Sequence, residues 1–164
     1  MMTILDAGVA LRRRAISSRE LTAACLRVIE QQNPRINAFL TVTADLALAA
    51  ADRADAELAA GIDRGPLHGV PIALKDVYST RGIRSTCGSL LFKDHVPEQD
   101  CAVAERLAAA GSVLLGKVGM HELAYGVTSS NPHFGAVRNP WNTERVPGGS
   151  SGGSSAAAAA GMAF

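Results

Sequence analysis

The residues best suited to chemistry form a run of glycines and serines at positions 146–155, Val-Pro-Gly-Gly-Ser-Ser-Gly-Gly-Ser-Ser, followed by five alanines. Such a run allows unusual backbone conformations, leaves N–H groups unshielded and supplies closely spaced hydroxyls. The alanines favour a helix, whose free N–H groups and positive dipole end would point at the loop. The pattern predicts a loop that can hold an anion or an oxyanion. The competing interpretation is a flexible linker.

A lysine closes an apolar segment. Residues 70–74 are apolar and short enough for a buried strand, and Lys75 follows them directly. The lysine either reaches out to solvent or is held inside as a chemical group. His121 and Glu122 raise the question of a metal site, but no third ligand stands at a suitable spacing, so structural polar contacts are expected. Nucleotide-binding glycine motifs are absent.

The segment of about residues 1–62 is predicted to be mainly helical. Its elements are, in order, a helix with Leu5, Val9 and Leu11 on its apolar side, a helix from a Ser17/Glu20 capping box to Asn33-Pro34, a strand within residues 36–42, and an alanine-rich helix over residues 44–60. The charged residues of the last helix, Asp55 among them, are expected to form a solvated face.

The segment of about residues 63–164 is predicted to be an α/β core that carries the catalytic loops. After the strand at 70–74 come a helix over 100–110, with Val103, Leu107 and Ala108 on its apolar side, and a strand over 112–116. A strand, a helix and a second strand in this order indicate a parallel crossover. The fold class expected is α/β, with a mixed, mainly parallel sheet covered by helices.

Composition limits the classes of function. The chain has 164 residues, about one domain, 48% of them hydrophobic, and a net charge of +1 without basic or acidic blocks. No nucleic-acid or membrane partner is therefore expected. Three cysteines without a CxxC pair predict free thiols in a reducing compartment. The N-terminus does not resemble a signal peptide and no long apolar run occurs, so a cytoplasmic location is expected.

Four motifs in order carry a family resemblance. They are residues 65–76 (Gly-Pro-Leu-His-Gly-Val-Pro-Ile-Ala-Leu-Lys-Asp), residues 121–126 (His-Glu-Leu-Ala-Tyr-Gly), residues 139–141 (Asn-Pro-Trp), and the glycine-serine run at 148–154. Together they resemble the amidase signature family over nearly the whole chain. The resemblance implies that residues 1–164 are the N-terminal part of a single amidase signature catalytic domain.

The family's Ser-cisSer-Lys triad implies roles for several residues. Lys75 resembles the catalytic lysine, Ser150 the bridging serine in a cis peptide, and Ser151 a helper that hydrogen-bonds the lysine end. Oxyanion or substrate contacts are expected from Gly148, Gly149, Gly152, Gly153, Ala124 and Tyr125, and the alternative for Tyr125 is a place in the core. The nucleophilic serine of the family lies beyond a position equivalent to Phe164, so no nucleophile is expected here and the isolated chain is expected to be inactive. No metal or organic cofactor is implied.

Three functions remain open. The first is an amidase that hydrolyses the C–N bond of a small-molecule carboxamide, for which a homodimer is one expected assembly. The second is the A subunit of a glutamyl-tRNA(Gln)/aspartyl-tRNA(Asn) amidotransferase, which releases ammonia from glutamine beside B and C subunits. Leu123-Ala124-Tyr125-Gly126 departs from the usual Phe-Met-Gly run of that protein. The third is a non-catalytic remnant or interaction module with an exposed sheet edge.

Overall fold

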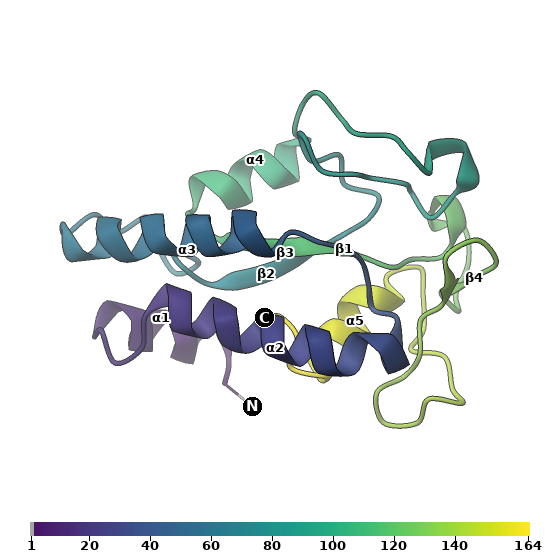
Figure 1. The fold of residues 1–164 in the computed structure, drawn as a ribbon, viewed down its shortest axis with the longest axis horizontal. Coiled ribbons are helices and arrows are strands. Elements are labelled where there is room, and N and C mark those ends of the chain that lie inside the picture. Colours follow the sequence, from purple (N-terminus) through teal and green to yellow (C-terminus); the bar gives the residue numbers. More distant parts are fainter. Residues whose placement is uncertain (1) are drawn as a thin grey trace.

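A computed structural model describes residues 2–164 and shows a small central sheet between layers of helices (Figure 1). The elements along the chain are α1 (Ile4–Arg12), α2 (Ser18–Ile36), β1 (Phe39–Val42), α3 (Ala44–Ala59), β2 (Pro71–Lys75), the 3-10 turn η1 (Leu90–Phe92), α4 (Ala102–Ala109), β3 (Val113–Val118), the 3-10 turn η2 (Glu122–Ala124), β4 (Ser130–Asn131), β5 (Gly135–Ala136) and α5 (Gly152–Ala159).

The central sheet has the strand order β1-β3-β2. β2 and β3 run parallel and are joined through α4, as the predicted crossover requires, whereas β1 is antiparallel to β3. The expected mixed α/β sheet is therefore confirmed, with one parallel and one antiparallel pairing. Because β2 and β3 are parallel, their carboxyl ends meet at one edge of the sheet, and the segments that follow them start side by side.

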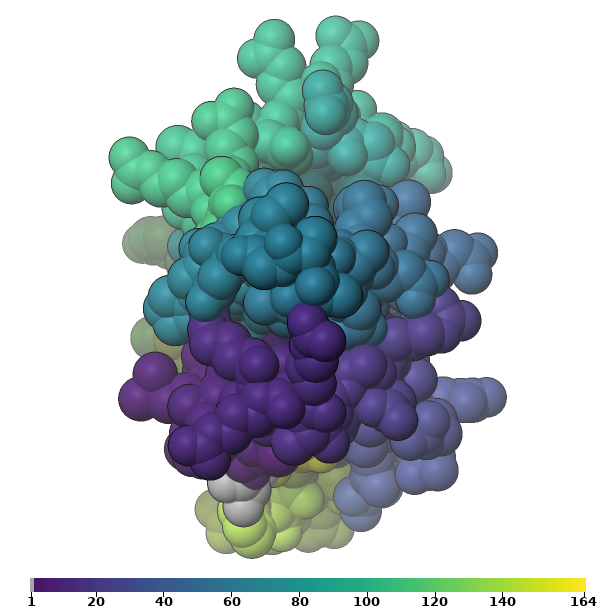
Figure 2. Space-filling model, turned by 90° about the vertical axis from the view of Figure 1, so that its left-hand side faces the viewer, coloured from purple at the N-terminus to yellow at the C-terminus, as the bar shows by residue number. Residues whose placement is uncertain are grey.

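Helices cover both faces of this sheet. In Figure 1, α4 lies above the sheet and α1, α2 and α5 lie below it. Figure 2 shows the surface at the end of the molecule near α1 and α3, where purple, blue-teal and green parts of the chain lie in layers one above another. The larger core cluster joins α2, α3 and α5 to the sheet through residues such as Ile29, Ala51, Leu115 and Ala157. No helix within residues 2–164 has both the length and the apolar character needed to cross a bilayer.

The second helix continues past the point where the sequence predicts its end. α2 includes Pro34 and runs to Ile36, so β1 starts only at Phe39. Asn37 ends the helix in the left-handed conformation, with its N–H donating to the Asn33 carbonyl. Pro34 has no N–H to donate to the carbonyl four residues earlier, but only Arg35 and Ile36 follow it in the helix, so the loss is confined to the helix end.

The apolar faces predicted for two helices are only partly right, since Leu11 is buried and Leu107 packs against the core but other members of each face are exposed. In α1, Leu5 and Val9 are 71% and 48% exposed, while Ala7, Gly8 and Leu11 are buried. In α4, Val103 is 41% exposed and Ala104 is buried. Small residues face the core because these helices approach their neighbours closely: a Cβ at Gly8 would lie 3.0 Å from the Pro66 carbonyl oxygen. A helical stripe of larger apolar residues does not reveal such close packing.

Asp55 corrects the prediction of a solvated charged face on α3. Its carboxylate accepts the N–H groups of Ser18 and Arg19 at 2.7 and 3.0 Å, at the first turn of α2. Those N–H groups have no partner within their own helix, and a negative charge there also interacts favourably with the positive end of the helix dipole. The side chain therefore joins α3 to α2.

A β-bulge in β3 decides which side chains reach each face. Ile72 pairs with Leu114 and Ala73 with Gly116, so Leu115 is an extra residue in β3. The register shift places Lys117 beside Leu74, where it is fully buried within the strand. β3 therefore extends to Val118, two residues beyond the predicted end at Gly116. Gly116 has a φ of +151° and lies against the β1 backbone.

We expect Gly116→Ala to destabilise the fold by about 3 kcal/mol, because the added methyl group overpacks a backbone contact. A Cβ at this position would collide with the Thr41 carbonyl and lie 3.0 Å from Val42 Cα. The matched control is Gly82→Ala, where φ is +72° but no atom lies within 4 Å of the added carbon. The control should cost about 1 kcal/mol, from backbone strain alone. Urea unfolding measures both values, and equal losses in the two variants would contradict the steric explanation.

Candidate active site

The site is centred on a hydrogen bond between residues 75 positions apart. Lys75, the last residue of β2, donates from Nζ to Ser150 Oγ at 2.7 Å. Lys75 is partly buried, and burial lowers its pKa below the ordinary value of 10.5 because desolvation disfavours the ammonium. Of the two interpretations of this lysine, the structure supports the one in which the amine is held inside.

The glycine-serine run is docked on a neighbouring loop. The Ser150 carbonyl accepts the His121 N–H at 3.1 Å, and the Gly153 N–H donates to the Gly119 carbonyl at 2.9 Å. The Gly152 N–H donates to Ser129 Oγ at 2.9 Å. The peptide bond between Gly149 and Ser150 is cis. With α5 beginning inside the run, at Gly152, these contacts show that the flexible-linker interpretation is wrong.

The four glycines of the run serve different purposes. A Cβ at Gly152 would lie 2.8 Å from Pro147 Cγ, and one at Gly153 would lie 2.9 Å from the Val118 carbonyl carbon, so both positions need close approach. Their N–H groups are used internally, which corrects the expectation that these two glycines contact an oxyanion. Gly148 has a φ of +91°, and Gly149 lies against the backbone of residues 127–129.

Donors for an anion remain in the middle of the run. Within residues 2–164, no protein hydrogen bond is made by the amide N–H groups of Gly148, Gly149, Ser150 and Ser151. They precede the first turn of α5, where the helix dipole adds partial positive charge. This stretch is the part of the loop that can accept developing negative charge.

Ser151 does not make its expected contact. Its side chain is exposed, and no hydrogen bond joins it to Lys75 in the described part of the chain. The side chain that supports the loop is Ser129, which is fully buried in the left-handed conformation with a φ of +55°. Ser129 is a residue that the sequence analysis missed. Nothing in its local sequence distinguishes it from Ser130, which is exposed.

Asn131 is a second missed residue. Its amide Nδ2 donates to the Gly88 and Met120 carbonyls at 2.7 and 3.3 Å, and its Oδ1 accepts the N–H groups of His133 and Phe134. The signal was present, because Asn before a proline favours a turn closed by its own side chain. This buried amide fixes the loop that supports the glycine-serine run.

The segment containing Ala124 and Tyr125 is a tight turn with its donors occupied. The Ala124 N–H donates to the His121 carbonyl and the Tyr125 N–H to the Glu122 carbonyl, both at 3.0 Å. Leu123 and Ala124 both have positive φ. Tyr125 is 92% exposed, so the alternative that it belongs to the core is wrong. Any substrate contact here would have to use side chains or carbonyls, because the two N–H groups are taken.

His121 and Glu122 make structural polar contacts, as predicted. Glu122 Oε1 lies 3.2 Å from His133 Nε2, and His121 Nδ1 lies 3.3 Å from Thr128 Oγ1. Among residues 2–164, no group of three or more His, Cys, Asp or Glu side chains is arranged to hold a metal ion. The three cysteines, Cys25, Cys87 and Cys101, are unpaired.

Comparison with known proteins identifies the family of the chain. A model of the family described as Amidase matches residues 20–164, so the chain belongs to this family and the predicted resemblance is confirmed. The solved structures of similar fold include amidase signature enzymes, one of them a bacterial aryl acylamidase.

Individual relatives include both amidases and a component of an amidotransferase. The A subunit of the glutamyl-tRNA(Gln) amidotransferase of Halorhodospira halophila is 51% identical over 149 residues, covering 91% of this chain and 31% of that protein. The peptide amidase from Stenotrophomonas maltophilia has a TM-score of 0.90 at 33% identity, covering 98% of this chain and 34% of that chain.

A third similar structure comes from a complex described as vestigial, which reveals the evolutionary origins of an s-triazine catabolic enzyme. Its chain has a TM-score of 0.95 at 38% identity, covering 99% of this chain and 36% of that chain. This chain thus spans about a third of the length of the relatives it matches.

Proposed function

We propose that Lys75 and Ser150 form the proton-transfer part of a Ser-cisSer-Lys centre that hydrolyses a carboxamide to a carboxylate and ammonia. The observation that carries the proposal is the 2.7 Å hydrogen bond from Lys75 Nζ to Ser150 Oγ, made by a lysine whose pKa burial lowers. A test is to express the complete reading frame that contains these residues and to assay a panel of aliphatic and aromatic carboxamides for ammonia and carboxylate. Failure of every carboxamide in the panel to release ammonia would contradict the proposal.

In the proposed mechanism, neutral Lys75 accepts the proton of Ser150, which accepts the proton of an attacking serine outside these 164 residues. That serine forms a bond to the amide carbon, and the carbonyl oxygen becomes an oxyanion near the free N–H groups around Ser150. The C–N bond then breaks as the proton returns along the same path to the leaving nitrogen, which departs as ammonia. Water hydrolyses the acyl-serine to the carboxylate by the same proton route.

The mechanism predicts the direction of the pH dependence. Only neutral Lys75 can accept a proton, and its neutral fraction grows as pH rises through its pKa. Because burial lowers this pKa, the rise of kcat/KM should be centred below pH 10.5, the ordinary lysine value. A pH–rate profile of the full-length enzyme measures this. A rise centred at or above the ordinary value would show that the rate does not depend on a desolvated lysine.

The isolated 164-residue chain is expected to have no amide turnover, because it contains no serine that the family pattern identifies as the nucleophile. Ammonia release can be followed with the purified chain at high concentration. Steady hydrolysis by the chain that disappears in its Lys75→Ala variant would contradict this expectation and place a nucleophile among the residues present.

A second candidate is favoured by the identity of 51% to the A subunit of an amidotransferase. In that case the substrate amide would be the side chain of glutamine, and the ammonia released would be used by a partner subunit. Leu123-Ala124-Tyr125-Gly126 departs from the run expected for such a protein, and this departure favours the amidase. Glutaminase activity that appears only when B and C subunits are added would favour the amidotransferase, and turnover of other carboxamides by the protein alone would favour the amidase.

A further inference from the structure

A second lysine lies buried on the opposite face of the sheet from the proposed site. Lys117 of β3 is fully buried, and it pairs in register with Leu74, the residue before Lys75. Successive side chains of a strand point to opposite faces, so Lys117 lies on the face away from Lys75 and Ser150. The bulge at Leu115 creates this placement. The mechanism proposed above does not use this lysine.

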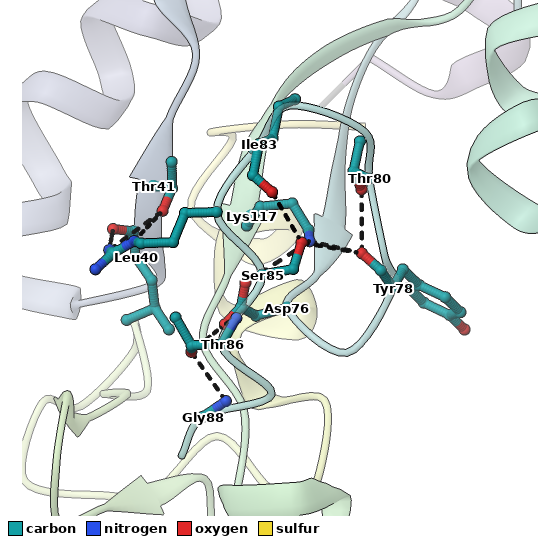
Figure 3. A network of polar contacts seen from close by, with 11 residues as sticks. Leu40, Thr41, Asp76, Tyr78, Thr80, Ile83, Ser85, Thr86, Gly88 and Lys117 are labelled. Carbon is teal, nitrogen blue, oxygen red and sulfur yellow. Dashed lines mark hydrogen bonds and ion pairs between the residues drawn. The ribbon is translucent and has the colours of Figure 1, made fainter. Parts of the chain in front are cut away.

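The Lys117 ammonium is held by a network around the turn that follows β2 (Figure 3). Its Nζ donates to the Tyr78 carbonyl at 2.6 Å and to Ser85 Oγ at 2.5 Å, and it lies 3.7 Å from Asp76 Oδ1. Asp76 is also buried, and its other oxygen accepts the Thr86 N–H at 2.9 Å and the Thr86 hydroxyl. Within residues 2–164, Asp76 Oδ1 has no hydrogen-bond partner, so Lys117 provides its only nearby charge partner.

Other titratable groups near Lys117 are two cysteines. Cys87 comes from the loop after β2 and Cys101 from the start of α4. Burial lowers the pKa of Lys117, and the carboxylate of Asp76 opposes that shift, followed by smaller effects of the two thiols. The surrounding charges therefore favour the ammonium that the hydrogen bonds require.

The groups held by this network are directly connected to Lys75. The Tyr78 N–H donates to the Lys75 carbonyl at 3.0 Å, which closes a turn, and the Asp76 N–H donates to the Val118 carbonyl at 3.0 Å. Lys117 thus contacts the last residue of a turn whose first residue is Lys75. One end of the Lys75 backbone is fixed by β2 and the other by this turn.

We propose that Lys117 and Asp76 are positioning residues that hold the turn after β2 and so keep the Lys75 amine on Ser150. The inference rests on the role proposed for Lys75. Removing both charges of a buried ion pair leaves no unpaired charge in the interior and so costs less stability than removing one of them, whereas a displaced proton acceptor slows catalysis. Stability and catalysis should therefore respond differently when both charges are removed.

The central experiment is the double variant Lys117→Met/Asp76→Asn in the full-length enzyme, because each single variant would leave an unpaired buried charge. We expect an unfolding midpoint close to that of the wild type, an unchanged KM, and a kcat lower by about 10²-fold. Lys93→Met is the matched control. That lysine is exposed and lies outside the network, so its replacement should leave kcat unchanged. Wild-type kcat in a folded double variant would overturn the proposal.

A chemical readout separates this proposal from the proposed function. Acetic anhydride labels lysine amines, and peptide mass spectrometry gives the rate for Lys75 relative to exposed Lys93. Loss of the Lys75 hydrogen bond should raise the Lys75 rate about tenfold in the double variant. If Lys75 proves dispensable for activity, the proposed function fails, and labelling still tests whether the network positions the amine. An unchanged Lys75 labelling rate would overturn the positioning role by itself.

If the double variant does not fold, Ser85→Ala provides the test with a smaller change. It removes one acceptor of Lys117 and keeps both charges. A kcat about tenfold lower with unchanged KM and faster Lys75 labelling is expected, from the loss of one hydrogen bond to an ion. Wild-type kcat together with wild-type labelling would overturn the proposal.

Discussion

Lys75→Met is expected to lower kcat/KM for amide hydrolysis by the full-length protein by about 10³-fold or more, as the loss of a proton acceptor does. Methionine keeps the apolar stem and the approximate length of lysine but cannot accept the proton of Ser150. The fold should be retained, because removing a desolvated amine relieves a cost of burial. Steady-state assays with the best amide of the panel measure the loss.

Two further variants refine this result. Lys75→Arg keeps a positive charge that remains protonated, so it should be as inactive as Lys75→Met if the neutral amine is the reactive form. Lys93→Met removes an exposed lysine and should retain wild-type activity. A Lys75→Arg variant with activity near that of the wild type would mean that charge, rather than proton acceptance, is what this position supplies.

Ser150→Ala is expected to lower kcat by about 10²- to 10⁴-fold, because it interrupts the path between Lys75 and the attacking serine. The adjacent Ser151→Ala is the matched control. Ser151 is exposed and makes no hydrogen bond to Lys75 in the described residues, so its loss should change kcat by less than about threefold. The comparison uses the same substitution at neighbouring positions of one loop.

The outcome for Ser151 also decides its expected role as a helper. A loss at Ser151 as large as that at Ser150 would mean that the loop rearranges when substrate binds and brings Ser151 to Lys75. Equal activity of Ser150→Ala and the wild type would remove Ser150 from the proton path.

Local patterns predicted the two segments of the site, a lysine that ends an apolar strand and a glycine-serine run before an alanine helix. The family resemblance paired Lys75 with Ser150, and in the structure their side chains lie 2.7 Å apart. The residues that hold this pair in place could not be predicted in the same way. Ser129 accepts the Gly152 N–H from 23 residues away in the chain, and no local sequence pattern predicts such a contact.

Lys117 shows most clearly why local patterns were insufficient. A lysine after Gly116 is typical of the end of a strand, and the sequence analysis ended the strand there. The bulge at Leu115 instead turns the side chain to a buried face, where its partner Asp76 comes from the end of a different strand. The prediction of the apolar faces of α1 and α4 was partly wrong for a related reason. Close packing of helices favours small residues at the contact, such as Ala104, over larger ones such as Val103.

The proposed chemistry requires a Lys75 amine that is neutral in the reactive enzyme, and a direct titration tests this requirement. NMR of lysines labelled with ¹³C at Cε, assigned by comparison with the Lys75→Met variant, gives the pKa of Lys75 beside that of exposed Lys93. We predict a Lys75 pKa below 10.5 that coincides with the rise of kcat/KM with pH and changes in Ser150→Ala. A Lys75 pKa at the ordinary value and insensitive to Ser150 would contradict the proposal that this lysine is the base of an amide-hydrolysing centre.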